Sequence, residues 1–364
     1  MKYTILFLVL VGVLIFVGCA KQSSQEEKYL KIGAILPLSG PAAIWGESIR
    51  NGMELAKQEL TAKNLSIKII YEDSQAKPSV GLSAYNKLVQ EDHVNMIVSA
   101  FSRVSVPLIS LVNQDRVPLV MTLVSAKGVT TKSPYAFRFY SPEKDYAAPS
   151  FEVLRKGYTS IGLLYLNDEY GTSVAQAIRD KAVESNILIL IEESFEPETT
   201  DFRTQLLKIK RKNPQALLFV GAVPVEVVNA VKQVKEMQLS SVFFEASPNL
   251  GVASVRETAG KSAEGVFTLA YPFTLGSTGI DFTEKYRIKY GEAPLYTAGM
   301  GYDMAMLVAK ASESKAMTGS VLVEKIMALN SFDSTNGPVQ IQPNREINPP
   351  LYVVKIVNGS LVRI

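Results

Sequence analysis

The sequence predicts an α/β protein with two lobes, each built on a doubly wound parallel sheet. Short apolar runs bounded by turn residues alternate with stretches of helical periodicity, as strands buried on both faces of a parallel sheet do. The alternation restarts after residue 140, and a chain of 364 residues can bury more than one core. These observations together favour two domains of one class.

The first apolar run, Ile32 to Leu38, is expected to be a central strand. Ile49, Met53, Ala56 and Leu60 follow at helical spacing, so a helix comes next. The glycine-proline loop between them leaves free N–H groups at a helix start, which favour anions such as carboxylates. The only tryptophan, Trp45, stands beside this loop.

The rest of the first half repeats the unit. Further strands are expected at residues 66–71, 96–100 and 117–122, with a helix from Val106 after the loop of residues 101–105. Ligand-binding loops gather at the carboxyl ends of parallel strands, so these loops are candidates for a site.

The second half begins with an aromatic segment, Tyr135 to Tyr140. Strands are then expected at residues 161–165, 187–191, 216–220, 242–244 and 265–273, with helices at 174–182, 202–211, 225–237, 282–290, 298–311 and 321–329, and strand-like tails at 338–341, 351–356 and 361–364. The loop that begins at Tyr271 is among those rich in hydroxyl and aromatic groups. Loops of this composition suit a small polar ligand with an apolar part.

Composition argues against an enzyme. The chain has one histidine and one cysteine, so neither a histidine-based catalytic triad nor a histidine-cysteine zinc site can be assembled. It has no phosphate-binding glycine loop, and a net charge of +3 leaves no electrostatic footprint for nucleic acid. We therefore expect a binding protein without cofactor or metal.

The amino-terminal residues predict export. Met1-Lys2 precedes an apolar run from Ile5 to Val17, which is short for a membrane span and ends at Phe16-Val-Gly-Cys19. This arrangement resembles a bacterial lipoprotein signal, in which Cys19 is lipidated and becomes the first residue of the mature chain. An uncleaved anchor or an ordinary signal peptide is the alternative. Polar residues 20–28 read as a solvated tether.

The order of motifs resembles the type I solute-binding proteins of ABC transporters, and most closely the branched-chain amino acid binding proteins. The resemblance rests chiefly on Ile32 to Gly46, Tyr71-Glu-Asp-Ser-Gln75, Asn167-Asp-Glu-Tyr-Gly171 and Tyr302-Asp303. It implies two lobes joined by three crossovers that close around a ligand like a hinge. It also implies an exported monomer that is lipid-anchored to the membrane, in the periplasm or at the outer face of the cell membrane, and that delivers solute to an ABC permease and its ATPase.

On this resemblance the chain divides into four parts. These are a signal peptide at 1–19, a tether at 20–29, a first lobe at 30–139 plus 273–340, and a second lobe at 140–272 plus 341–364. The crossovers are expected near Phe139–Pro142, Leu269–Phe273 and Gly337–Asn344.

The family's pocket transfers only in part. Trp45 matches the aromatic residue that packs on the ligand, and Tyr170 matches the second-lobe tyrosine. Either Ser102 or Arg103 would bond the ligand carboxylate, and an arginine there would suit an anionic ligand. Ala126 replaces a threonine of the next loop, for which Ser125 or Thr122 could substitute.

Two further family positions differ. Ala222 stands in place of a tyrosine, and the acidic residue that anchors the ligand's amino group is missing, with Glu245 the nearest carboxylate. A buried ammonium without a carboxylate is costly. The departures therefore favour a ligand without an amino group unless Glu245 turns inward. A sensory protein of the same fold, signalling to a membrane partner, is the alternative to transport.

Overall fold

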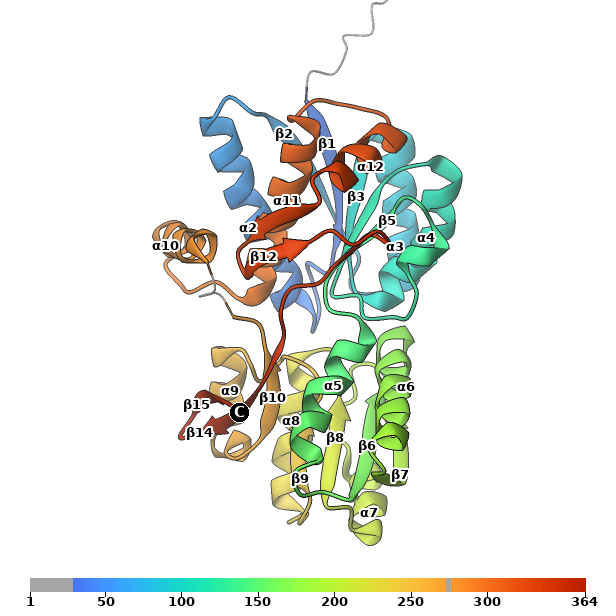
Figure 1. The fold of residues 1–364 in the computed structure, drawn as a ribbon, viewed down its shortest axis with the longest axis vertical. Coiled ribbons are helices and arrows are strands. Elements are labelled where there is room, and N and C mark those ends of the chain that lie inside the picture. The colour runs from blue at the N-terminus through green and yellow to red at the C-terminus, as the bar shows by residue number, and fades with distance from the viewer. Residues whose placement is uncertain (1–28, 273–275) are drawn as a thin grey trace, which may run out of the picture.

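The computed structural model describes residues 29–272 and 276–364, which form two lobes (Figure 1). Cys19, the apolar run before it and nearly all of the expected tether lie outside the described residues. In the part of the chain that is described, no helix is long and apolar enough to cross a membrane.

The first lobe is built on a six-stranded sheet of order β13-β5-β4-β3-β1-β2 with parallel neighbours. Its strands are β1 (Leu30–Leu36), β2 (Ile67–Asp73), β3 (Met96–Ala100), β4 (Leu119–Thr122), β5 (Ala136–Phe139) and β13 (Glu346–Ile347). All seven residues of β1 are buried, as expected for a strand with both faces covered.

Helices flank this sheet, and a two-stranded hairpin packs beside them. They are α2 (Ala43–Ala62), α3 (Pro78–Asn86), α4 (Ser102–Asp115), α10 (Ser277–Tyr290), α11 (Tyr296–Ser312) and α12 (Gly319–Ala328), with β11 (Ser331–Ser334) and β12 (Gly337–Gln340) as the hairpin. Helices α2 and α11 touch through glycines: a Cβ on Gly52 would lie 1.9 Å from the Ala298 carbonyl oxygen, and one on Gly301 would lie 2.2 Å from that of Ile49. This contact brings the first half of α2 and the first half of α11 against each other.

The second lobe carries a seven-stranded sheet of order β15-β14-β10-β9-β8-β6-β7. Its strands are β6 (Ser160–Leu166), β7 (Leu188–Phe195), β8 (Ala216–Val220), β9 (Val242–Glu245), β10 (Phe267–Ala270), β14 (Tyr352–Val357) and β15 (Ser360–Arg363). Strands β6 to β10 pair in parallel, whereas β14 and β15 add antiparallel strands at one edge. The helices are α5 (Glu143–Leu154), α6 (Glu169–Glu184), α7 (Arg203–Lys212), α8 (Pro224–Glu236) and α9 (Ala253–Ala259).

The chain passes between the lobes three times: at residues 140–142, between β10 and α10, and at residues 348–351. The third passage was expected earlier, near Gly337–Asn344. It lies later because β13 pairs in parallel with β5, where Glu346 forms an ion pair with Arg138. Residues 346–347 therefore extend the first sheet beyond the expected boundary at residue 340.

Two local features also differ from expectation. Helix α4 begins at Ser102 rather than Val106, because Phe101, at φ 73°, turns the chain directly after β3 and accepts the N–H of Ser105 at 2.9 Å. Helix α5 was not predicted, and the proline at position 149 inside it obscures a helical pattern.

Candidate ligand-binding site

A small cavity lies between the lobes and has a volume of about 30 Å³. The residues around it come from helix starts and strand ends of both sheets. They are Trp45, Phe101, Leu123, Tyr140, Tyr170, Gly221, Ala222, Ser247, Pro248, Asn249 and Tyr296. None of these side chains carries a formal charge at neutral pH, and five are aromatic. The wall thus suits a ring or another apolar body.

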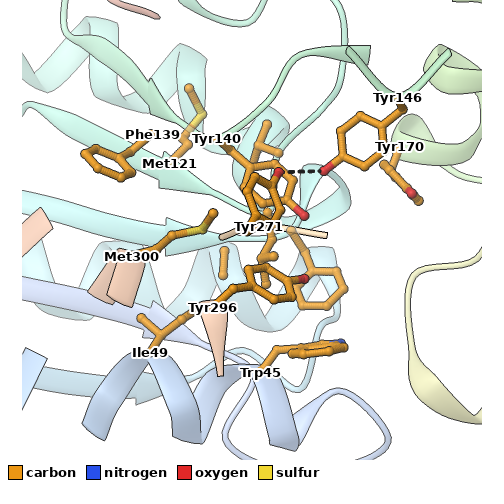
Figure 2. Close-up of a cluster of buried hydrophobic side chains, with 14 of the residues drawn as sticks. Trp45, Ile49, Met121, Phe139, Tyr140, Tyr146, Tyr170, Tyr271, Tyr296 and Met300 are labelled. Atoms are coloured by element: carbon orange, nitrogen blue, oxygen red, sulfur yellow. Dashed lines mark hydrogen bonds between the residues drawn. The ribbon is translucent and has the colours of Figure 1, made fainter. Parts of the chain in front are cut away.

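The aromatic residues form a continuous cluster (Figure 2). The rings of Trp45 and Tyr296 lie 5.6 Å apart between centroids, and Tyr296 lies 4.9 Å from Tyr271 behind it. Tyr140 lies 5.7 Å from Tyr271 on another side. Burial raises the pKa of Tyr140, Tyr170 and Tyr296 well above the usual value, so their hydroxyl groups stay protonated and can donate hydrogen bonds.

Trp45 and Tyr170 stand in equivalent places, each in the first turn of a helix that follows a strand. The helix of Tyr170 is capped by Asp168, whose Oδ1 accepts the N–H of Gly171 at 2.8 Å. Close packing needs glycine there, since a Cβ on Gly171 would lie 2.0 Å from the Leu166 carbonyl oxygen. The two rings are therefore held by backbone geometry as well as by packing.

Ser102 and Arg103 lie directly after the wall residue Phe101, at the start of α4, and are 1% and 8% exposed. Among the described residues, no hydrogen-bond partner reaches Ser102 Oγ, Arg103 Nε or Asp168 Oδ2. Arg103 Nη1 lies 3.9 Å from Asp168 Oδ2, across the two lobes. Burial raises the pKa of Asp168 to about 6, against the lowering effects of the Gly171 N–H and Arg103.

Buried polar atoms without partners are rare in proteins. Three of them belong to residues next to wall residues in the sequence, and two of these residues, Ser102 and Arg103, are those from which a carboxylate contact was expected. Neither Ser102 nor Arg103 lines the cavity itself, because the Phe101 ring lies there and the Arg103 guanidinium stands 5.7 Å from its centroid.

Three other candidates use their hydroxyl groups elsewhere. Thr122 Oγ1 donates to Met300 Sδ at 3.4 Å, and Ser125 Oγ donates to the Ser141 carbonyl oxygen at 2.9 Å. Tyr271 donates to Ser141 Oγ at 3.0 Å. These contacts direct the three hydroxyl groups away from the cavity wall.

Glu245 is 1% exposed and accepts hydrogen bonds within its own loop. Its donors are Ser247 Oγ at 2.9 Å, Asn249 N at 3.0 Å, Asn249 Nδ2 at 2.9 Å, Leu250 N at 2.9 Å and Thr268 Oγ1 at 2.6 Å. Burial raises the pKa of Glu245 and these donors lower it. The carboxylate thus holds the wall segment 247–249 in place and has little capacity left for a ligand ammonium.

Of the expected residues, Trp45, Tyr170 and Ala222 meet at the cavity. Tyr140 and Tyr296 were missed, because one belongs to a crossing segment and the other to the first turn of a late helix. Phe101 and Leu123 fall inside strand-end loops of the first half that were identified as candidates for a site, and Ser247 to Asn249 follow strand β9 in the second lobe.

A family model described as periplasmic binding protein matches residues 29–360. The chain belongs to this family. The family consists of binding proteins without enzymatic activity, in agreement with the expectation that this chain is a binding protein. The match also confirms the predicted fold class.

One curated relative is a leucine-, isoleucine-, valine-, threonine- and alanine-binding protein of Pseudomonas aeruginosa, 20% identical over 323 residues and 86% of each chain. Among solved structures, the branched-chain amino acid binding protein LivJ of Streptococcus pneumoniae, in complex with isoleucine, has a TM-score of 0.82 at 21% identity over 92% of this chain and 98% of that one. An R. palustris solute-binding protein in complex with benzoate has a TM-score of 0.84 at 18% identity over 92% and 95%. At these identities the structural similarities show the fold.

Proposed function

We propose that the protein captures a small carboxylate-bearing solute outside the cytoplasm and delivers it to an ABC permease driven by its ATPase. The family supports the transport role, and the position of the cavity between two lobes suits capture by closure. The lipoprotein-like start of the sequence supports attachment of the chain to a membrane through Cys19.

We further propose that the solute is an organic acid without an α-amino group, an aromatic carboxylate above all. The observation that carries this choice is a wall with five aromatic side chains in which the carboxylate of the adjoining loop, Glu245, already accepts five hydrogen bonds. Asp168, a second buried carboxylate two residues before the wall residue Tyr170, faces the Arg103 guanidinium at 3.9 Å, so a ligand ammonium would have to compete with Arg103 for it. A ring instead gains contact with Trp45, Tyr170 and Tyr296.

The carboxylate of the solute is assigned to the start of α4. Ser102 Oγ and Arg103 Nε are buried there without partners, and the helix N-terminus adds free N–H groups and a favourable dipole. Movement of the Phe101 ring would open the way from the cavity to these groups. A guanidinium also binds a carboxylate through two parallel hydrogen bonds.

Solved structures of this fold hold ligands of both kinds. The LivJ structure holds isoleucine, whereas R. palustris proteins hold benzoate or 4-hydroxybenzoate. The fold therefore accommodates either class, and the wall chemistry of this chain supports the aromatic acids.

Isothermal titration calorimetry against two matched panels tests the proposal. One panel holds benzoate, hydroxybenzoates and other organic acids, and the other holds leucine, isoleucine and valine. Binding of aromatic acids alone is the expected result, and Arg103→Ala should weaken it while Arg50→Ala, which removes a half-buried arginine of the same lobe that lies outside the cavity wall, should not. Binding of the aliphatic amino acids alone would contradict the ligand class, and binding of neither panel would contradict the proposed solute.

A further inference from the structure

The three crossing segments meet at one buried hydroxyl group, that of Ser141. Tyr271, which follows β10 in the second crossing, donates to Ser141 Oγ at 3.0 Å. Ser141, in the first crossing, donates in turn to the carbonyl oxygen of Pro349 in the third, at 3.4 Å. A single side chain thus links all three connections between the lobes.

The same chain of hydroxyl groups reaches into both lobes. On the side of the second lobe, Tyr146 of α5 has its hydroxyl oxygen 3.2 Å from that of Tyr271. Tyr271 has one hydroxyl proton, which Ser141 accepts, so Tyr146 is the donor of this bond. On the side of the first lobe, Ser125 donates to the Ser141 carbonyl oxygen at 2.9 Å.

We call this network the hinge clasp; it consists of the side chains of Ser125, Ser141, Tyr146 and Tyr271 and the carbonyl groups of Ser141 and Pro349. The four side chains are buried. In such surroundings hydrogen bonds in series strengthen one another, and a group that loses its partner is costly. The clasp therefore favours the arrangement of the lobes in which every member is paired.

The hinge clasp contacts the wall of the ligand cavity through the aromatic ring of Tyr271. Tyr271 stacks on Tyr296 at 4.9 Å and an interplanar angle of 30°, and it lies 5.7 Å from Tyr140. Both neighbours line the cavity, whereas the Tyr271 hydroxyl lies against that of Tyr146 (Figure 2) and donates to Ser141 Oγ in the first crossing. A ligand that packs on Tyr140 and Tyr296 would thus also hold Tyr271 against Ser141.

We propose that Ser141 and Tyr271 are positioning residues that hold the lobes closed and slow the release of the ligand. The proposal rests on the proposed function only in that closure retains a solute. Rotation of one lobe bends all three crossings, and the clasp has members on each of them and on both lobes. Opening must therefore break or rearrange hydrogen bonds of the clasp before the ligand can leave.

The test uses Tyr271→Phe and Ser141→Ala, singly and together. Tyr271→Phe removes the hydroxyl group and keeps the ring stacking on Tyr296. The matched control is Tyr290→Phe, because the Tyr290 hydroxyl donates to the Asn51 carbonyl oxygen at 2.9 Å within the first lobe alone. Urea unfolding of each variant confirms that both lobes remain folded.

The first readout is the dissociation rate of the acid that binds most tightly in the panel, followed by stopped-flow fluorescence of Trp45. Each single variant should release it about 5 to 10 times faster, as the loss of one buried hydrogen bond implies. The double variant should release it no faster than the faster single variant, because both changes break the same chain of bonds. Tyr290→Phe should match the wild type.

Release rates of both single variants within a factor of about two of the wild type would overturn the proposal, as would effects that multiply in the double variant. The second readout, small-angle X-ray scattering of the ligand-free protein, needs no solute. If no acid binds, the proposed solute fails, and the clasp is judged by scattering: a more open shape in Tyr271→Phe supports it, and an unchanged shape overturns it.

Discussion

Replacing Glu346 by glutamine should destabilise the protein strongly, although the two side chains have nearly the same shape. Glu346 lies on β13, the last strand before the third crossing, and pairs with Arg138 on β5. Oε2 accepts Arg138 Nε at 2.6 Å, while Oε1 accepts Arg138 Nη2 and Thr130 Oγ1, each at 2.8 Å. The side chains of the pair are only 4% and 8% exposed.

The expected loss follows from the charge that remains. Removing one partner of a buried ion pair costs about 3–5 kcal/mol, because the other charge stays buried without compensation. Arg138 keeps a hydrogen bond from Nη1 to the Ala126 carbonyl oxygen at 2.8 Å, so we expect the lower end of that range. Urea unfolding followed by circular dichroism measures the change.

Glu236→Gln is the matched control, since it breaks a pair with Arg203 in which both side chains are more than half exposed. Exposed pairs contribute below about 1 kcal/mol. If Glu346→Gln cost no more than this control, the buried pair would not hold β13 on β5. A combined Arg138→Met and Glu346→Leu variant should recover most of the loss, because it leaves no unpaired charge.

Three further predictions concern other buried groups. Burial raises the pKa of Asp303 from 3.8 to about 8, so the wild type should lose free energy of unfolding as the pH rises between those values; Asp303→Asn should remove that part of the slope in urea titrations at several pH values. Trp45→Ala should weaken binding of the ligand about tenfold or more in calorimetry, with Trp45→Phe in between, because a ring of the wall is lost. Glu245→Gln should lower the free energy of unfolding by about 1–3 kcal/mol and weaken binding without touching the ligand, since the donors of the wall loop lose a charged acceptor; unchanged unfolding and affinity would contradict that role.

The sequence predicted those features of the structure that depend on a single strand or helix and the residues next to it. The buried run at Ile32 and the alternation after it predicted the parallel sheets, because a strand covered on both faces is apolar throughout. Trp45 and Tyr170, which the family resemblance proposed for the ligand site, both line the cavity from the first turn of a helix that follows a strand. Ligand contacts by all candidate residues stay predictions.

The features that the sequence did not predict depend on contacts between segments that are far apart in the chain. Tyr296 reaches the cavity because α11 packs on α2 through Gly52 and Gly301, and local sequence around residue 296 carries no sign of that contact. Strand β13 has two residues, too few for any periodicity, and is held by an ion pair with a residue far away in the chain.

The size of the cavity indicates that a conformational change precedes the entry of the ligand. Small-molecule pockets usually measure roughly 300–1,000 Å³, whereas the cavity lined by these aromatic side chains is about 30 Å³. In this arrangement of the lobes the cavity therefore has no room for a solute of the proposed class, and the lobes must open, or the wall rings must turn, before entry. The ligand and the aromatic side chains of the wall compete for the same volume. Substitutions that favour opening of the two lobes should therefore raise the association rate of the ligand as well as its dissociation rate. The equilibrium affinity alone can then conceal a role of the hinge, and the two rate constants reveal it.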